Sequence, residues 1–324
     1  MRLGRWRAEG VVHDGVLRDD AALPFARGYT VGDALALGLA HLPTIASWAD
    51  EEAAVPLADV TLLVPVEAAS VRDFVAFEEH VEGVSAAIDG ASDVPAEWYE
   101  YPTFYFTNPH TLLADRATVR PPRSARMDFE LEVAAVIGGA DGSDGRDLSP
   151  AAAEAHLFGY TIMNDWSARD VQGREMRVRL GPCKGKDFGT SLGPWIVTAD
   201  ELEPYRDEDG FLVLEVEASV NGTRIGRDLL SNMGWPFAEL AAYASRDSRI
   251  VPGDVLGSGT AGNGGCLAEL WGRSGGLTPA PLSPGDEVVL RVEGIGALHG
   301  TVGIASDPPA IPPARARSRA RLRV

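Results

Sequence analysis

The chain has few cysteines, a deficit of basic residues and no long hydrophobic run. Two cysteines in 324 residues, Cys183 and Cys266, are too few for a disulfide framework and predict a reducing, cytoplasmic environment. A formal charge of −18 argues against nucleic acid as a partner, because phosphate binding needs a basic surface. No apolar run approaches the roughly 18–20 residues of a membrane span, and no signal-peptide core is visible, so we expect no membrane association.

The succession of polar and apolar segments predicts three parts. Residues 1–62 read as a small N-terminal module, and residues 63–306 as the main domain. Residues 307–324 are rich in proline and arginine and are expected to be a disordered basic tail. Strands punctuated by turns outnumber helices and do not alternate with them, which predicts a β-rich α+β fold.

Local signals predict several elements of the N-terminal module. We expect a hairpin over 5–17 that turns at 13–15, and a helix over 34–48 capped by Asp33. The apolar residues 57–66 read as a buried strand that leads into the main domain.

Two signals further along the chain are stronger. Asn221-Gly222, inside an alternating segment, predicts a β-hairpin turn. Pro236 precedes an apolar segment that reads as a short helix ending near Tyr243, because proline fits the first turn of a helix.

Residues 157–195 concentrate polar side chains in an otherwise apolar or small sequence: Asp165, Arg169, Gln172, Lys184 and Lys186. On a helix, Asp165, Arg169 and Gln172 would share one face, which predicts a helix start that points them into a cleft. An Asp–Arg pair on a helix is more often structural. The two lysines and the glycines that follow favour an anionic ligand instead.

Glu130 and Glu132 lie two residues apart in the β-rich segment 127–138, so a strand would present both carboxylates on one face. Adjacent carboxylates repel each other unless a cation lies between them or water solvates them fully. The apolar continuation of the segment makes full solvation a poor explanation, and we expect a metal ion there.

Asp73 and His80 would share one face of a helix over 71–83, although the spacing alone fits a charged surface helix as well. Glu269 lies in the apolar sequence LAEL, which we read as a strand. A buried glutamate needs a partner, and His80 is the candidate.

The strings MNDWSARDVQ (163–172) and GPCKGKDFGTSLGPW (181–195) closely resemble the fumarylacetoacetate hydrolase family. The resemblance extends over roughly 64–304. It implies an α+β fold of layered β-sheets rolled around a metal cleft, usually in a homodimer, with 63–306 as the catalytic domain. It also implies a small anionic oxo-acid substrate.

The resemblance further implies a role for each matching residue. Four carboxylates would bind a divalent cation, and because they offer only oxygen we expect Mg²⁺, or else Ca²⁺ or Mn²⁺. These metal ligands are Asp73, Glu130, Glu132 and Asp165. The expected catalytic residues are His80 as general base, Glu269 as its orienting partner, and Lys186 with Gln172 at the oxyanion. The expected substrate-binding residues are Arg169, Tyr105, Thr260 and Val75.

Three features depart from the family pattern. Val75 stands where the family often has tyrosine, which removes a hydroxyl from the substrate pocket. The segment 173–180 has one extra residue, and the loop 260–269 is shorter than in the eukaryotic enzymes. The exact substrate therefore stays open.

We expect a metal-dependent hydrolase that cleaves a carbon–carbon bond in a β-diketo acid or acylpyruvate with an activated water. The alternative is a 2-oxo acid decarboxylase, isomerase or dehydratase, which would use the same cation and enolate without hydrolytic water. A third possibility is a metal-dependent binding or structural protein. The joint presence of His80, Glu269 and Lys186 argues against that one.

Overall fold

A computed structural model describes residues 1–89 and 94–314, with only the backbone described for residues 84–89. Its main sheet consists of β1 (Arg2–Ala8), β2 (Val11–Arg18), β3 (Ala21–Pro24), β4 (Val55–Pro56), β5 (Thr61–Leu62), β6 (Ser70–Phe74), β7 (Phe104–Thr107), β8 (Leu112–Leu113), β11 (Leu131–Ile137), β12 (Leu157–Asp165), β14 (Thr190–Thr198) and β17 (Asp254–Gly257). The strand order is β4-β3-β2-β1-β14-β12-β11-β17-β6-β7, with β5 beside β1 and β8 beside β14.

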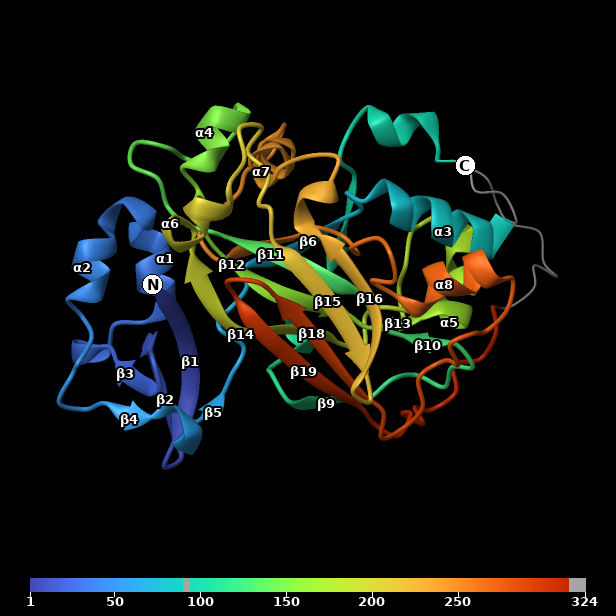
Figure 1. Ribbon diagram of the computed structural model, residues 1–324, viewed down its shortest axis with the longest axis horizontal. Helices are drawn as coiled ribbons and strands as arrows, with labels where there is room; N and C mark the ends of the chain where they lie inside the picture. The colour runs from blue at the N-terminus through green and yellow to red at the C-terminus, as the bar shows by residue number, and fades with distance from the viewer. Residues whose placement is uncertain (90–93, 315–324) are drawn as a thin grey trace, which may run out of the picture.

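A smaller sheet lies in front of the centre of the main sheet in the view of Figure 1. Its order is β16-β15-β18-β19-β9. These strands are β9 (Ala117–Val119), β15 (Glu215–Val220), β16 (Thr223–Leu229), β18 (Glu287–Val292) and β19 (Gly296–Val302), and a separate pair is formed by β10 (Met127–Asp128) and β13 (Ser167–Ala168). The predicted turn at Asn221-Gly222 is confirmed, since both residues have the positive φ that a tight hairpin turn requires.

Helices surround the sheets and are mostly short. They are α1 (Val31–Leu37), α2 (Leu42–Ala46), α3 (Glu78–Asp89), α4 (Pro150–Glu154), α5 (Arg169–Glu175), α6 (Ala199–Leu202), α7 (Phe237–Ser245) and α8 (Leu267–Ser274). The 3₁₀ turns are η1 (Ala26–Gly28), η2 (Leu39–His41), η3 (Leu57–Asp59), η4 (Ala96–Tyr99), η5 (Pro109–Thr111), η6 (Met176–Val178), η7 (Glu203–Tyr205) and η8 (Leu230–Asn232). The helix predicted after Pro236 is confirmed as α7.

The core lies where the two sheets face each other. Val133 and Ile162 of the main sheet share one buried cluster with Val216 and Leu290 of the smaller sheet. Burial of each such side chain stabilises the fold by about 1.5–3 kcal/mol. Every residue of β11 and β12 is buried, so both strands are covered on both faces. The prediction of a β-rich fold with layered sheets is confirmed, with 33% strand and 25% helix.

The N-terminal hairpin is confirmed, but its predicted turn is wrong. The turn lies at Glu9 and Gly10, while residues 13–15 pair across the hairpin with β1. The predicted strand over 57–66 is also wrong, because it contains η3 and only the short strand β5. β5 pairs only with Trp6 and Arg7 of β1, on the edge where Arg2 and Leu3 pair with β14.

The helix expected over 34–48 is wrong as a single element. The chain turns at Gly38, whose φ of 91° ends α1, and an added Cβ there would lie 2.1 Å from the Gly139 carbonyl oxygen. The residue that caps α1 is Thr30, and Asp33 completes a reciprocal capping box with it.

Strand β1 joins the first residues of the chain to the middle of the main sheet. It pairs with β14, and Leu3 and Val16 share a buried cluster with Val136 and Phe158. The sheet and this core therefore continue across residue 62. The division of the chain into domains stays a prediction.

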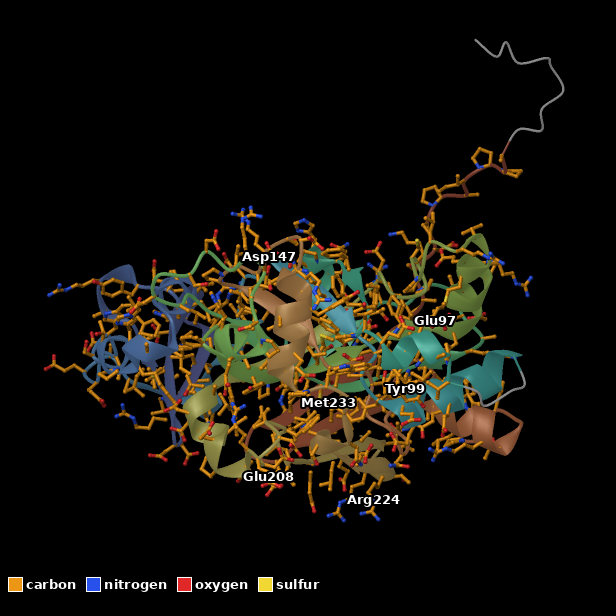
Figure 2. All side chains as sticks on the ribbon, turned by 90° about the horizontal axis from the view of Figure 1, so that it is seen from above. Glu97, Tyr99, Asp147, Glu208, Arg224 and Met233 are labelled. Atoms are coloured by element: carbon orange, nitrogen blue, oxygen red, sulfur yellow. The ribbon has the colours of Figure 1, made fainter. Side chains whose placement is uncertain are left out.

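The end of the described chain leaves the body of the molecule. Residues 307–314 have no regular structure and run away from the sheets as an extended segment (Figure 2). The remainder of the predicted disordered tail, 315–324, lies outside the described residues. Within the ranges that the structure describes, no helix is long and apolar enough to cross a membrane.

Candidate functional site

A cavity of about 360 Å³ lies at the edge of the main sheet, and β6, β7, α3 and α5 contribute to its wall. Ten of the twelve predicted site residues line it: Asp73, Val75, His80, Tyr105, Glu130, Glu132, Arg169, Gln172, Lys186 and Thr260. Asp165 lies directly behind this lining, in contact with Tyr105 and Lys186. Glu269 is the one predicted site residue that neither lines the cavity nor contacts its lining through a hydrogen bond or ion pair among the described residues.

Neighbouring strands bring two of the carboxylates together. Gly257 of β17 pairs with Asp73 of β6 on one side and Ala134 of β11 on the other. A Cβ at Gly257 would lie 2.7 Å from Asp73 Oδ1 and 3.0 Å from Glu132 Oε2. The bare backbone of glycine thus leaves the space that the two carboxylates occupy.

The predicted helix over 71–83 is wrong in its first half. Asp73 lies in strand β6, and the chain turns before α3 begins at Glu78. His80 belongs to the first turn of α3, and both side chains still line the cavity. They reach the same cavity from a strand and from the helix that follows it, not because they share a helix face.

The helix predicted to carry Asp165, Arg169 and Gln172 is also wrong for its first member. Asp165 is the last residue of strand β12, while α5 starts at Arg169. Asn164 pairs with Leu131 across β12 and β11, so Asp165 comes next to the start of β11 and Glu130. Arg169 and Gln172 nevertheless line the cavity, and Asp165 reaches it through its contact with Lys186.

Lys186 joins two of the predicted carboxylates. Its buried ammonium group donates to Glu130 and, at 2.5 Å, to Asp165 Oδ2. Burial would lower the pKa of Lys186, but Asp165 and Glu130 raise it above its ordinary value. Burial would likewise raise the pKa of Glu130, but Arg169 and Lys186 hold it well below its usual range. Lys186 and Glu130 are therefore both charged.

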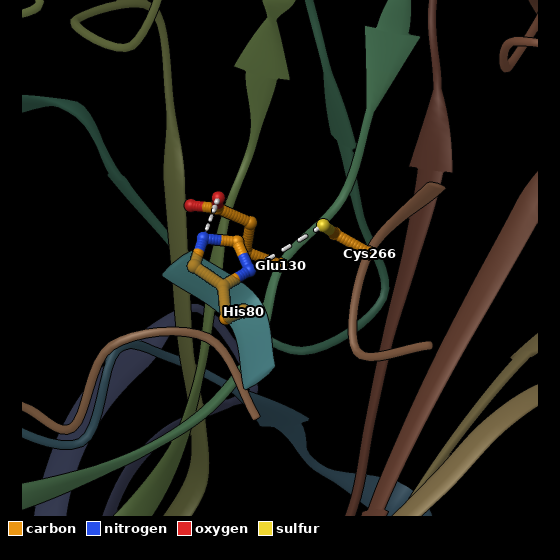
Figure 3. Close-up of side chains that lie close together, drawn as sticks. All are labelled: His80, Glu130 and Cys266. Atoms are coloured by element: carbon orange, nitrogen blue, oxygen red, sulfur yellow. Dashed lines mark hydrogen bonds and ion pairs between the residues drawn. The ribbon is translucent and has the colours of Figure 1, made fainter. Parts of the chain in front are cut away.

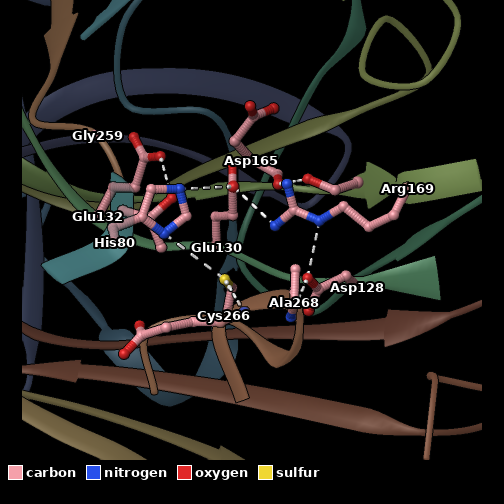
Figure 4. A network of polar contacts seen from close by, with 12 residues as sticks. His80, Asp128, Glu130, Glu132, Asp165, Arg169, Gly259, Cys266 and Ala268 are labelled. Atoms are coloured by element: carbon pink, nitrogen blue, oxygen red, sulfur yellow. Dashed lines mark hydrogen bonds and ion pairs between the residues drawn. The ribbon is translucent and has the colours of Figure 1, made fainter. Parts of the chain in front are cut away.

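Arg169 uses its whole guanidinium group inside the site (Figure 4). Nε donates to Asp128 at 2.9 Å, Nη2 to Glu130 at 2.8 Å, and Nη1 to Gln172 at 3.2 Å. The predicted role of Arg169, binding the substrate carboxylate, stays a prediction. In this arrangement Arg169 neutralises the carboxylates of the protein itself.

His80 presents a neutral imidazole to the cavity. Its Nε2 lies 3.7 Å from Glu130 Oε1, and its Nδ1 lies 3.7 Å from the Sγ of Cys266 (Figure 3). Burial, helped by Arg169 and Lys186, lowers the pKa of His80 to about 4, although Glu130 opposes the shift. An uncharged imidazole can accept a proton.

Glu269 does not contact His80, so the predicted pair is wrong in this structure. Glu269 lies in helix α8, not in a strand, and is buried. Its carboxylate lies 2.6 Å from Nη2 of Arg273, one turn further along α8, and accepts from the Gly264 amide at 3.2 Å. Because these partners belong to α8 and the loop before it, the carboxylate points away from the cavity.

Tyr105 and Thr260 touch the carboxylates from the rim of the cavity. The Tyr105 hydroxyl donates to Asp165 Oδ2 at 2.5 Å, and the Thr260 hydroxyl donates to Glu132 Oε1 at 3.5 Å. Burial and the charges of Asp165 and Asp73 raise the pKa of Tyr105, so it remains a donor. Val75 adds an apolar side chain at the same rim.

Comparison with known proteins identifies the family. The profile of the fumarylacetoacetate (FAA) hydrolase C-terminal family matches residues 69–303 of this chain. The chain belongs to the fumarylacetoacetate hydrolase family. This family membership confirms the resemblance seen in the sequence, and the relatives are enzymes.

The relatives of known name catalyse different reactions. Fumarylacetoacetase from Arabidopsis thaliana is 30% identical over 300 residues, which cover 76% of this chain and 70% of that protein. The structure of 5-carboxymethyl-2-hydroxymuconate delta-isomerase from Mycobacterium smegmatis has a TM-score of 0.67 at 26% identity, covering 94% of this chain and 100% of that chain. Maleylpyruvate hydrolase from Sphingobium sp. SYK-6, at 20% identity, has a TM-score of 0.65 over 94% of this chain and 100% of that chain, and shows the fold alone.

The donor atoms of the cavity suit a hard divalent cation. Asp73 Oδ1 and Glu132 Oε2 are buried without a hydrogen-bond partner among the described residues. Burial, together with repulsion from neighbouring carboxylates, raises the pKa of both acids well above ordinary values. A divalent cation would give the buried oxygen atoms a partner and would offset the repulsion between the carboxylates. Oxygen donors favour Mg²⁺, Ca²⁺ or Mn²⁺.

A second group of donors lies beside this one. The potential ligand atoms of His80, Glu130 and Cys266 fall within 4.8 Å of one another, whereas the four predicted carboxylates form no such compact group in the described chain. Lys186 instead holds Glu130 and Asp165. Burial raises the pKa of the Cys266 thiol, which disfavours the thiolate that a soft metal would need.

Sequence reasoning missed two residues of the site. Asp128 accepts from Arg169 and also from the amides of Leu267 and Ala268 at the start of α8, at 2.7 and 3.0 Å. The alternation of Asp128 with Glu130 and Glu132 could have indicated it. Cys266 had no such signal, because its contact with His80 depends on how α8 packs against α3.

Proposed function

We propose that this chain is a metal-dependent hydrolase that cleaves a carbon–carbon bond in a β-diketo acid or acylpyruvate. One observation supports this most directly: two buried carboxylates, each with one oxygen that has no hydrogen-bond partner among the described residues, lie in the same cavity as a neutral histidine and a buried lysine. Asp73, Glu130, Glu132 and Asp165 would hold the cation, and Mg²⁺ suits their oxygen atoms.

When bound, a divalent cation supplies Lewis-acid polarisation of the substrate oxygens. The other steps belong to residues of the chain. His80, as the neutral imidazole on the cavity wall, accepts a proton from water, and the resulting hydroxide adds to the substrate carbonyl carbon. Lys186, through its ammonium group, and Gln172, through its amide, stabilise the oxyanion that forms.

Cleavage then follows from the tetrahedral adduct. The carbonyl re-forms as a carboxylic acid while the adjacent carbon–carbon bond breaks. The electron pair of that bond leaves as the enolate of the second product, which takes up a proton from the imidazolium of His80. Cys266, at His80 Nδ1, and Glu130, at Nε2, are the groups that orient this ring.

A panel of acylpyruvates, with Mg²⁺ and with chelator, tests this proposal. We expect loss of the enol absorbance and release of two carboxylic acids, abolished by chelator and restored by Mg²⁺ or Mn²⁺. If no member of the panel yields two acids with any of these cations, the proposed hydrolysis is wrong.

An isomerase or decarboxylase of 2-oxo acids is the second candidate. The 26% identical structure of a hydroxymuconate delta-isomerase supports it, as does the absence of a His80–Glu269 contact in the described chain. Product analysis separates the two reactions, because isomerisation conserves mass, decarboxylation releases carbon dioxide, and hydrolysis adds the elements of water.

Assembly and compartment are part of the same proposal. We infer a homodimer, as in the family, which light scattering of the purified protein would test. Both cysteines are free thiols in the structure, which supports a reducing cytoplasm.

A further inference from the structure

The cavity is lined by two kinds of side chain. The carboxylates, Arg169 and Lys186 are the charged part. The apolar part, which we call the apolar wall, consists of Phe74, Val75, Phe104, Met176 and Pro182. A substrate whose oxo-acid end meets the carboxylates would therefore turn its other end towards the apolar wall.

The apolar wall continues into a neighbouring cavity of about 400 Å³ that shares Tyr105, Pro182 and Lys186 with the first. Phe106 lines this second cavity, is 67% exposed, and packs edge-on against Phe104. The rest of the second lining is polar or charged, namely Thr107, Asn108, Cys183, Lys184 and Asp187, so the apolar contacts come from Phe106 and from the wall of the first cavity.

The arginine and the lysine that line the first cavity both pair with groups of the protein itself. Arg169 donates to Asp128, Glu130 and Gln172, and Lys186 donates to Glu130 and Asp165. His80, the remaining basic residue of the lining, lies 3.7 Å from Glu130 Oε1 through Nε2 and 3.7 Å from Cys266 Sγ through Nδ1. A second carboxylate on the substrate would thus be desolvated beside an acidic site without a partner.

Two basic residues near the wall are paired, whereas Arg174, Arg177 and Arg179 are exposed and line neither cavity. Arg72, behind Phe104 and Phe106, donates to Asp254 and to the Arg249 carbonyl. Lys184 lines the second cavity and pairs with Asp187. The segment 84–93, VSAAIDGASD, follows the first part of α3 and contains no basic residue.

We propose that the acyl end of the substrate is uncharged and apolar, so that the substrate carries one carboxylate, at its oxo-acid end. This inference rests on the proposed function and narrows it to acylpyruvates with an alkyl or aryl tail. Dicarboxylates such as a fumaryl-type β-diketo acid are the class that the apolar wall disfavours.

Two acylpyruvates of equal length test the inference, one with a butyl tail and one with a 3-carboxypropyl tail. We expect kcat/KM for the butyl compound to be higher by about tenfold to a hundredfold, because its tail loses no hydration of charge. From methyl to butyl tails, kcat/KM should rise by about fourfold per methylene, the effect of burying one such group. Equal or higher kcat/KM for the carboxypropyl compound would overturn the inference while leaving the hydrolysis itself intact.

A charge introduced into the wall should reverse the preference. Met176 is 42% exposed, so Met176→Arg can be accommodated at the mouth of the cavity. We expect Met176→Arg to raise kcat/KM for the carboxypropyl compound at least about fivefold and to lower it for the butyl compound. The size-matched Met176→Leu should keep the preference of the parent protein, and a preference unchanged in Met176→Arg would contradict the role of the wall.

Two further variants exclude other sources of charge. Lys184→Met removes the exposed cation that lines the second cavity, and truncation after residue 314 removes the five arginines of 315–324. Neither change should alter the ratio of the two kcat/KM values by more than about twofold. If the parent protein cleaves neither substrate with any divalent cation, the proposed hydrolysis fails. A preference for the carboxypropyl compound would instead overturn only the inference about the apolar wall.

Discussion

At the scale of single residues, the site is a cluster of buried charges that compensate one another. Lys186 is the central member, because it is buried and bridges Asp165, at the end of β12, and Glu130, just before β11. Removing one partner of a buried ion pair leaves the other charge uncompensated, which costs more than the pair itself contributes.

We expect Lys186→Met to lower the free energy of unfolding by about 3–5 kcal/mol in chelator, and added Mg²⁺ to restore part of it. Urea denaturation with and without Mg²⁺ measures both effects. The matched control is Lys184→Met, whose exposed pair with Asp187 should contribute less than about 1 kcal/mol. A Lys186→Met protein as stable as the parent in chelator would contradict this account.

His80 is the residue whose loss should affect chemistry more than binding. We expect His80→Ala to lower kcat by about 10²–10⁴-fold, the range for losing a general base, with little change in affinity for the cation. Stopped-flow turnover and calorimetric Mg²⁺ titration measure the two separately. His110→Ala, at an exposed position, is the control. Unchanged kcat in a folded His80→Ala protein would remove His80 from the mechanism.

Glu269 should make stability depend on pH. Burial raises its pKa from 4.5 to about 7, with Arg273 opposing the shift. The folded protein therefore binds this proton more tightly than the unfolded chain, so the stability it contributes is complete below pH 4.5 and is lost as pH rises to 7. The free energy of unfolding should fall by about 3 kcal/mol over this pH range.

Glu269→Gln tests this pH dependence, because glutamine can still accept from the Gly264 amide but does not titrate. The free energy of unfolding of Glu269→Gln, relative to the parent, should rise between pH 4.5 and 7. Urea denaturation at intervals across that window measures the difference. A difference that stays constant or falls with pH would show that Glu269 is not protonated more readily in the folded state.

At the scale of elements, α3 and α8 pack closely through a glycine. An added Cβ at Gly83 would lie 2.4 Å from Cγ of Glu269 and 3.2 Å from its Cα. Gly83 is three residues after His80 on α3, so any displacement of the helix also moves the imidazole.

We expect Gly83→Ala to lower stability by about 1–3 kcal/mol through overpacking and to lower kcat. Gly173→Ala on α5, where an added Cβ meets no atom within 4 Å, is the matched control and should be neutral or stabilising by up to about 1 kcal/mol. Thermal unfolding and steady-state kinetics compare the two. Equal behaviour of both variants would mean that α3 can shift without cost.

The sequence predicted the residues of the site better than the elements that carry them. Asn221-Gly222 and Pro236 gave correct elements because turn and cap chemistry is local. The helix expected around Asp165 is a strand, since an apolar run buried on both faces has no period that separates strand from helix. Similarly, Asp73 and His80 meet through a strand–turn–helix path, and the missing Glu269 contact depends on tertiary packing that spacing cannot reveal.

At the scale of the whole molecule, the first 62 residues complete the main sheet. Strand β1 covers the edge of β14, and Leu3, Val16 and Leu23 belong to the buried cluster that contains Phe158. Removing them would expose this cluster and a row of unpaired backbone groups on β14.

We therefore expect a fragment of residues 63–324 to lack cooperative unfolding, with retained far-UV but weakened near-UV circular dichroism and binding of a hydrophobic dye. The full chain is the control under the same conditions. A fragment that unfolds cooperatively and keeps activity would instead support the predicted boundary at residue 62 as a true domain limit.

The carboxylates beside Gly257, those of Asp73 and Glu132, come from β6 and β11, strands far apart in sequence that lie on either side of β17. An ion held there would cross-link two strands that do not pair directly with each other. Resistance to heat and proteolysis would then report how fully the protein is loaded, and stripping the ion would loosen the sheet around β17 first.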